Sequence, residues 1–173
     1  MFDQIGNMPL HPLVLHAAVV GIPLAGLLAF LFAFPRTRAW ARWPLGLTVL
    51  GAAAATFVTK QSGEALQRRL NIGPGNAAGD LIQRHAQLAN QLFIIMIIFA
   101  VIGVANVLAV SRGRSAAVGT QPTGGQRIVR VILPALLVVI AVIAMIWVVR
   151  VGDLGSRAVW NPSGAELVIT LPR

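Results

Sequence analysis

Residues 88–110 decide the fold of this chain, and they read LANQLFIIMIIFAVIGVANVLAV. The stretch holds 23 residues without a charge, and its polar members are only Asn90, Gln91 and Asn106. A helix needs about 20 mostly apolar residues to cross a hydrocarbon layer of about 30 Å. The stretch therefore predicts a helix that spans a membrane.

Three further segments, 12–34, 43–59 and 131–149, are equally apolar and uncharged. Together with the stretch 88–110, whose helix we expect to begin at residue 86, they make four predicted spans. The 173 residues are 57% hydrophobic and 11% charged, against about 25% charged in a soluble domain. The mean hydropathy is +0.78. We expect an all-α membrane protein, a four-transmembrane-helix bundle that forms a single domain over 1–173.

Small residues predict how the first two spans pack. They recur at every fourth position of the first span, at Ala17, Gly21, Ala25, Ala29 and Ala33. The second span is also rich in glycine and alanine. Helices in a bilayer associate where small residues let their backbones approach closely. We therefore expect these two helices to lie against each other.

The loop 60–85 and the tail 150–173 lie on one side of the four predicted spans. Residues 62–70 have the pattern of a short amphipathic helix. Residues 161–164 read Asn-Pro-Ser-Gly, a turn signal that suggests a hairpin in the tail. We expect a small cap outside the membrane on this side.

Charge placement predicts the orientation. The loops 35–42 and 111–130 contain seven arginines and no acid: Arg36, Arg38, Arg42, Arg112, Arg114, Arg127 and Arg130. The other side carries seven basic residues as well, but also all five acids. Short basic loops stay in the cytoplasm. We therefore expect both termini on the outer side of the membrane.

Several classes of function are excluded by composition. The chain has no cysteine, which excludes disulfides, cysteine-ligated zinc, iron–sulfur clusters and covalently bound haem. The net charge of +9 comes from basic residues in loops that flank the spans, so no nucleic-acid partner is expected. There is no glycine-rich phosphate loop and no nucleophile with a base beside it. We expect no independent enzymatic activity.

The three histidines are the residues best suited to chemistry. His11 enters the first span, His16 lies deeper in it, and His85 directly precedes the apolar part of the third span. The topology places all three near the outer face. Two histidines on different helices can bind a haem iron from opposite sides, and without cysteine the haem is b-type. We expect His16 and His85 as the axial pair, with His11 as the alternative to His16.

Three arginines on the same side, Arg68, Arg69 and Arg84, are the expected partners of the haem propionates. Two other interpretations stay open. His11, His16 and His85 together could hold copper or zinc in a half-open metal site. Alternatively the histidines only pack and hydrogen-bond, and the chain is a cofactor-free accessory subunit with protein partners in a larger membrane complex.

Four short motifs resemble a known family. They are His11-Pro12-Leu13-Val14-Leu15-His16, Ser62-Gly63-Glu64, His85-Ala86, and Gly152-Asp153-Leu154-Gly155 followed by Val159-Trp160. Together they resemble a bacterial membrane family, domain of unknown function 2231, over nearly the whole chain. The resemblance implies a four-span protein of the bacterial inner membrane, with His11, His16 and His85 at the matching positions.

The same resemblance favours a redox role, because some relatives are fused to, or encoded beside, Rieske-type modules. Relatives often carry a histidine after the Val-aromatic pair of the tail. This chain has Asn161-Pro162 there, so the resemblance carries over no ligand from the tail.

Overall fold

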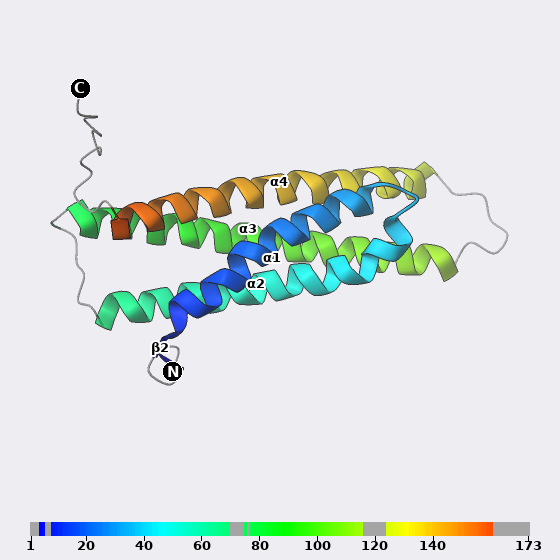
Figure 1. Ribbon diagram of the computed structural model, residues 1–173. Helices are drawn as coiled ribbons and strands as arrows, with labels where there is room; N and C mark the ends of the chain where they lie inside the picture. Colours follow the sequence, from blue (N-terminus) through cyan, green and yellow to red (C-terminus); the bar gives the residue numbers. More distant parts are fainter. Residues whose placement is uncertain (1–3, 6–7, 70–74, 76, 116–123, 161–173) are drawn as a thin grey trace, which may run out of the picture.

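The computed structural model describes residues 4–5, 8–69, 75, 77–115 and 124–160. Four helices, α1 (Leu10–Ala33), α2 (Arg38–Arg69), α3 (Ala77–Ser115) and α4 (Gly124–Trp160), make up nearly all of this part (Figure 1). Two short strands, β1 (Gln4–Ile5) and β2 (Met8–Pro9), pair antiparallel just before α1. All four helices are long and apolar enough to cross a membrane. The predicted four-span helical bundle is confirmed.

The helices extend beyond the apolar segments that predicted them. α2 has 32 residues and is about 48 Å long, well beyond a hydrocarbon layer of about 30 Å. The helix expected over 62–70 is not separate, because residues 62–69 continue α2. Lys60 and Glu64 form an ion pair of 2.6 Å one turn apart, which supports an unbroken helix there. Of the expected tail hairpin, residues 158–160 belong to α4 and residues 161–171 lie outside the described residues.

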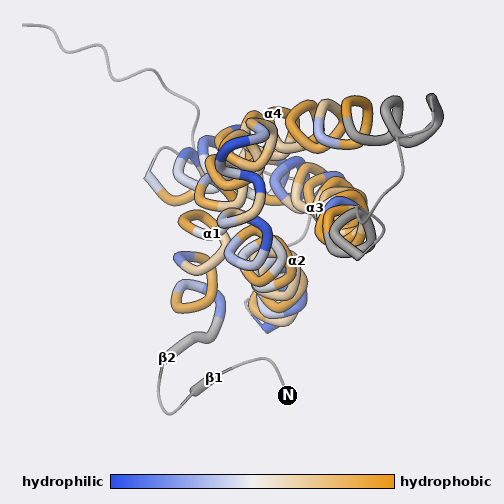
Figure 2. Tube along the Cα trace, turned by 90° about the vertical axis from the view of Figure 1, so that its right-hand side faces the viewer, coloured by the Kyte–Doolittle hydropathy of each residue, from blue (hydrophilic) through white to orange (hydrophobic). Residues whose placement is uncertain are grey.

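The four helices surround one centre in the order α1, α2, α3, α4. Each packs against the next, and α4 packs against α1. In the view along the bundle, α1 and α3 lie on opposite sides, with α2 and α4 between them (Figure 2). The start of α1 and the end of α4 lie at the same end of the bundle, together with the end of α2 and the start of α3 (Figure 1).

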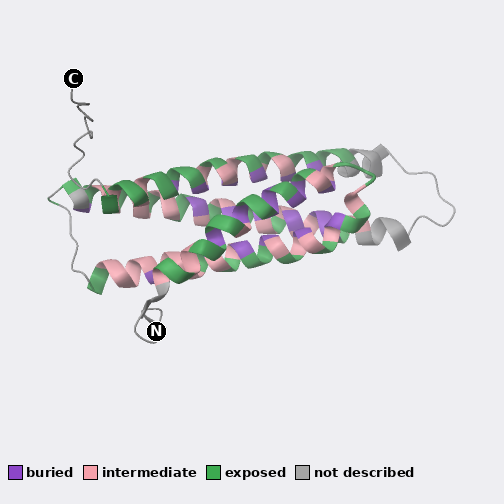
Figure 3. Cartoon of the chain, viewed as in Figure 1, coloured by how far each residue is buried: buried purple, intermediate pink, exposed green. Residues whose placement is uncertain are grey.

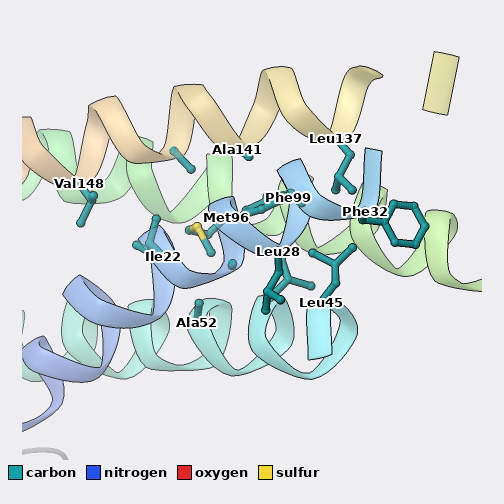
Figure 4. Packing of buried hydrophobic residues seen from close by; sticks show 14 of the residues in the cluster. Ile22, Leu28, Phe32, Leu45, Ala52, Met96, Phe99, Leu137, Ala141 and Val148 are labelled. Carbon is teal, nitrogen blue, oxygen red and sulfur yellow. The ribbon is translucent and has the colours of Figure 1, made fainter. Parts of the chain in front are cut away.

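The core is apolar and lies along the middle of the bundle. Its largest fully buried side chains come from all four helices (Figure 4): Ile22, Phe32, Leu45, Met96, Phe99 and Leu137. The exposed positions, green in Figure 3, lie on the outer surfaces of the helices. Many large apolar residues are among the exposed ones. Leu47, for example, is 72% exposed. An outer surface of this kind suits contact with lipid rather than water.

The stripe of small residues on α1 does bring α1 against α2. Ala25 and Ala29 are fully buried. A Cβ atom at Gly21 would lie 3.4 Å from the Cβ of Ala52 on α2, which is ordinary van der Waals contact. Ala17, at the start of the stripe, is exposed. The predicted close packing of the first two spans is confirmed in the middle of the stripe.

One polar side chain joins α3 to α4 within the apolar core. Asn106 is 2% exposed, and its Nδ2 donates to the carbonyl of Leu133 on α4 at 3.1 Å. Nδ2 also lies 2.9 Å from the carbonyl of Ile102 on its own helix. Leu133 directly precedes Pro134, at a point where a proline interrupts the hydrogen bonds of α4. The amide of Asn106 thus finds two carbonyl acceptors although it is buried among apolar residues.

Candidate functional site

His11 lies in the first turn of α1 and contacts the end of α2. Its Nδ1 is 2.9 Å from the carbonyl oxygen of Thr59. A carbonyl only accepts, so Nδ1 carries the proton and donates it. The hydroxyl of Ser62 donates to the same carbonyl at 2.9 Å and lies 3.3 Å from Nδ1. These bonds hold the half-buried imidazole in one orientation against α2.

The ring of His11 lies against the backbone of Gly63. A Cβ atom at position 63 would come within 3.0 Å of the imidazole Cε1 and 3.2 Å of Nδ1. Real Cβ atoms rarely approach so closely. Glycine at this position therefore makes room for the histidine ring on the surface of α2.

His85 on α3 is held by α4 in the same way. Its Nδ1 donates to the carbonyl of Val151 at 2.9 Å. A Cβ atom at Gly155 would come within 3.0 Å of the His85 Cε1 and 3.2 Å of its Nδ1. The ring is half-buried, as is that of His11.

The two histidines are thus held by two equivalent units. In each unit a histidine near the start of one helix donates from Nδ1 to a carbonyl of the next helix. The glycine four residues after that carbonyl lies under the ring. The hairpin of α1 and α2 supplies one unit, and the hairpin of α3 and α4 supplies the other. We call the end of the bundle that carries both units, His11 with Gly63 and His85 with Gly155, the histidine end.

Both imidazoles keep a nitrogen with a free lone pair. Because Nδ1 carries the proton in a neutral ring, Nε2 is unprotonated and able to bind a metal. The rings come from α1 and α3, which lie across the bundle from each other. The arrangement offers two imidazole nitrogens from opposite sides of one bundle.

His16 is placed differently. It is exposed on α1, and its Nδ1 donates to the carbonyl of Pro12 in the same helix at 2.7 Å. Among the described residues, no hydrogen bond from another helix holds its ring. Of the three histidines expected at the site, the structure brings His11 and His85 into matching units and leaves His16 on the outer surface of α1.

The expected arginines lie at the histidine end with exposed side chains. Arg68 and Arg69 end α2, and Arg84 directly precedes His85. Arg68 lies 4.0 Å from Glu64, with a side chain that is 72% exposed. All three are exposed to water at this end. In the described part of the chain, no group of three or more His, Cys, Asp or Glu residues is arranged to hold a metal ion.

Two further polar features lie near the site. Trp147 on α4 donates from Nε1 to Oε1 of Gln91 on α3 at 3.0 Å. This bond links α3 to α4 further along α3 than His85. The hydroxyl oxygen of Thr59, beside the His11 unit, is buried and has no hydrogen-bond partner among the residues that the structure describes.

The sequence did not reveal the role of the two glycines. Gly63 and Gly155 occur in motifs that follow the second and fourth spans, but nothing in either motif says which residue faces them. The signal that could have found them is a repeat. In each half of the chain a histidine opens one helix, and a glycine follows the apolar stretch of the next.

Comparison with known proteins gives a family but no closer relative. A family model described as "Predicted membrane protein (DUF2231)" matches residues 7–165. No curated protein matches the chain. No solved structure matches it either.

Proposed function

The chain belongs to the DUF2231 family of predicted membrane proteins, and on that premise we propose that it is a small b-type cytochrome or redox-associated membrane subunit. In this proposal His11 and His85 bind the haem iron through Nε2. His11 takes the place that sequence reasoning gave first to His16.

The observation that carries the proposal is the shared orientation of the two rings. A histidine that ligates a metal nearly always donates its other nitrogen to a carbonyl or carboxylate, which fixes the ring and its tautomer. His11 and His85 both do so, each at 2.9 Å to a backbone carbonyl. His16 bonds only within its own helix. Two neutral imidazoles from opposite helices would be suitable ligands for a haem iron.

The rest of the chain is compatible with this donor set. There is no cysteine to attach a haem covalently, so the haem would be b-type. A bound haem would supply one-electron transfer. Arg84, next to His85, and Arg68 and Arg69, at the end of α2, would pair with the propionates. The protein would hold the two imidazoles in place and would exclude water from the haem.

We further propose the bacterial inner membrane as the location, with the histidine end and both termini on the periplasmic side. The argument is the placement of charge. The loop between α1 and α2 carries Arg36, Arg38 and Arg42 without an acid, and basic residues in short loops stay in the cytoplasm. A site at the opposite end would exchange electrons with partners on the periplasmic side.

The test is the visible spectrum of protein purified with haem available, oxidised and then reduced with dithionite. We expect a Soret band and sharp reduced α and β bands. His11→Ala and His85→Ala should each abolish these bands while the helical content is retained. His16→Ala is the matched control, because it removes a histidine from the same helix, and it should keep the full spectrum.

Two results would overturn the proposal. One is a flat spectrum under these conditions. The other is a haem spectrum that survives the loss of His11 and of His85. If His16→Ala alone removes the bands, the pair expected from sequence, His16 with His85, replaces His11 with His85.

The same two nitrogens support copper or zinc as a second candidate, since imidazole is a good ligand for both. Elemental analysis of the purified protein separates this candidate from haem. Protein free of both haem and metal would favour the remaining alternative, an accessory subunit. That alternative predicts co-purification with a membrane complex in mild detergent.

A further inference from the structure

An apolar groove runs along α4 on the side that faces α1. Its inner part has a volume of about 260 Å³ and is lined by Pro23, Gly26 and Phe30 of α1 and by Ala141, Val142 and Met145 of α4. A shallow, more open part of about 440 Å³ is lined by α4 alone; it shares Val142 and Met145 and continues to Val149 and Arg150. No histidine lines either part, so the groove is separate from the site proposed above.

The length of the groove matches one leaflet of a bilayer. Its lining on α4 runs from Val138 to Arg150. Twelve helical residues rise about 18 Å, slightly more than half of a hydrocarbon layer of about 30 Å. Arg150 directly follows the apolar stretch 131–149, so it lies where the hydrocarbon ends and the headgroups begin. The groove thus extends from the interior of the membrane to its surface at the histidine end.

A positive charge stands at the outer end of the groove. The Arg150 guanidinium lies 5.5 Å from the centre of the Trp147 ring, a cation–π contact that holds it at the mouth of the groove. The nearby acid Asp153 is paired with Arg157 at 3.0 Å. Among the described residues no carboxylate lies within ion-pair distance of Arg150. Its charge is therefore available to an anion at headgroup level.

We propose that this groove binds one anionic phospholipid, with an acyl chain along α4 and the phosphate on Arg150. The walls are made of apolar side chains, which suit a hydrocarbon chain. The exposed residues Leu27, Phe30 and Val142 are large, whereas a second helix would need small residues for close approach. The combination of an apolar groove, a leaflet-long span and a cation at its mouth selects a lipid over a partner helix.

The test is native mass spectrometry of the protein released from nanodiscs that contain equal amounts of phosphatidylglycerol and phosphatidylcholine. We expect one bound lipid, with phosphatidylglycerol preferred about fivefold, the effect of one basic residue at a membrane surface. Arg150→Gln should remove the preference. Arg157→Gln is its matched control, because it removes a charge from the same helix whose partner is already Asp153.

A second pair of variants tests the groove itself. Val142→Trp fills it, and should abolish the retained lipid of either class. Val139→Trp adds the same ring on the same helix, on a residue that is 56% exposed and does not line the groove, and should change nothing.

Three outcomes would overturn the proposal. The first is equal retention of both lipids by the unaltered protein. The second is an equal effect of Arg150→Gln and Arg157→Gln, which would indicate surface charge in general. The third is a stable dimer that Val142→Trp disrupts, which would assign the groove to a second copy of the chain.

Discussion

The imidazole of His85 lies directly against the α4 backbone at Gly155, where a Cβ atom would come within 3.0 Å of the imidazole Cε1. The same ring donates to the carbonyl of Val151, one turn earlier. The bare backbone of the glycine and the accepting carbonyl together hold the ring, and we call this pair the seat of the histidine. Because His11 has the same relationship to Gly63 and Thr59, the seat is a repeated feature of the fold.

Gly155→Ala should therefore cost stability, although alanine is the better helix former. The new methyl group pushes the ring of His85 away and weakens its bond to Val151. We expect the free energy of unfolding to fall by about 1–3 kcal/mol, the usual effect of overpacking. Thermal or denaturant unfolding in detergent, followed by circular dichroism, measures it.

Gly152→Ala is the control for that change. A Cβ at position 152 meets nothing within 4 Å, so only the helix propensity acts, and we expect a gain of up to about 1 kcal/mol. Equal stability of the two variants would show that the seat does not constrain the histidine.

Gly63→Ala tests the first hairpin in the same way. Here the methyl group would meet His11, which also lies near Ser62. We expect a loss of the same sign and of similar size, about 1–3 kcal/mol. Gly51→Ala, on the same helix with open space at its Cβ, should be neutral or slightly stabilising. Opposite signs for Gly63→Ala and Gly155→Ala would contradict the equivalence of the two units.

The protonated nitrogen of each ring is a separate prediction. Because Thr59 and Val151 offer carbonyls, the neutral His11 and His85 should carry their protons on Nδ1. Nitrogen-15 NMR of the metal-free protein, with His11→Ala and His85→Ala used for assignment, distinguishes the two tautomers. Protons on Nε2 would contradict the structure and remove the free lone pairs on which metal binding depends.

Asn106→Leu should weaken the contact between α3 and α4. Leucine has the same branched arrangement of heavy atoms but cannot donate to Leu133, and hydrogen bonds between membrane helices contribute about 0.6–1.7 kcal/mol. We expect a loss in that range in the unfolding free energy. Asn90→Leu, at an exposed position of the same helix, is the control and should be close to neutral. A larger loss from Asn90→Leu would contradict the assigned role of Asn106.

Arg38→Ala should destabilise the turn between α1 and α2. Its guanidinium donates to the carbonyls of Phe32 and Ala33 at 3.1 and 2.9 Å, which would otherwise lack partners at the end of α1. Hydrogen bonds from a charged group contribute about 1.5–3 kcal/mol, and we expect a loss of that order on thermal unfolding.

Arg36→Ala removes an equal charge from the same loop, where Arg36 is exposed, and should cost little. The comparison separates the capping role of Arg38 from the effect of loop charge on topology. If both variants lose the same stability, the capping argument fails.

The limits of each span illustrate what hydropathy does and does not predict. The apolar stretch 43–59 ends at Lys60, the first charged residue, but α2 continues to Arg69. Hydropathy indicates where a segment passes from lipid to water, whereas a helix ends only where its backbone hydrogen bonds end. Lys60 and Glu64 are charged and still helical, because their ion pair lies along the helix surface. The same holds for α4, which continues past Arg150 to Trp160.

Four membrane-spanning helices, with all three histidines near one end of the bundle, could be predicted from the sequence alone. Both conclusions rest on local composition, because a span needs only enough consecutive apolar residues. That His11 contacts α2 while His16 bonds only within its own helix emerges from the packing of the helices. Five residues turn a helix by about 140° beyond a full circle, so the two rings leave α1 in different directions.

Which of those directions faces α2 depends on how α1 is rotated in the bundle, and that rotation is set by packing at residues such as Gly21, Ala25 and Ala29. The contacts of the histidine rings with Gly63 and Gly155 likewise depend on how the helices pack. The sequence shows that a glycine has no side chain. Only the packing of the neighbouring helix shows which residue fills the space.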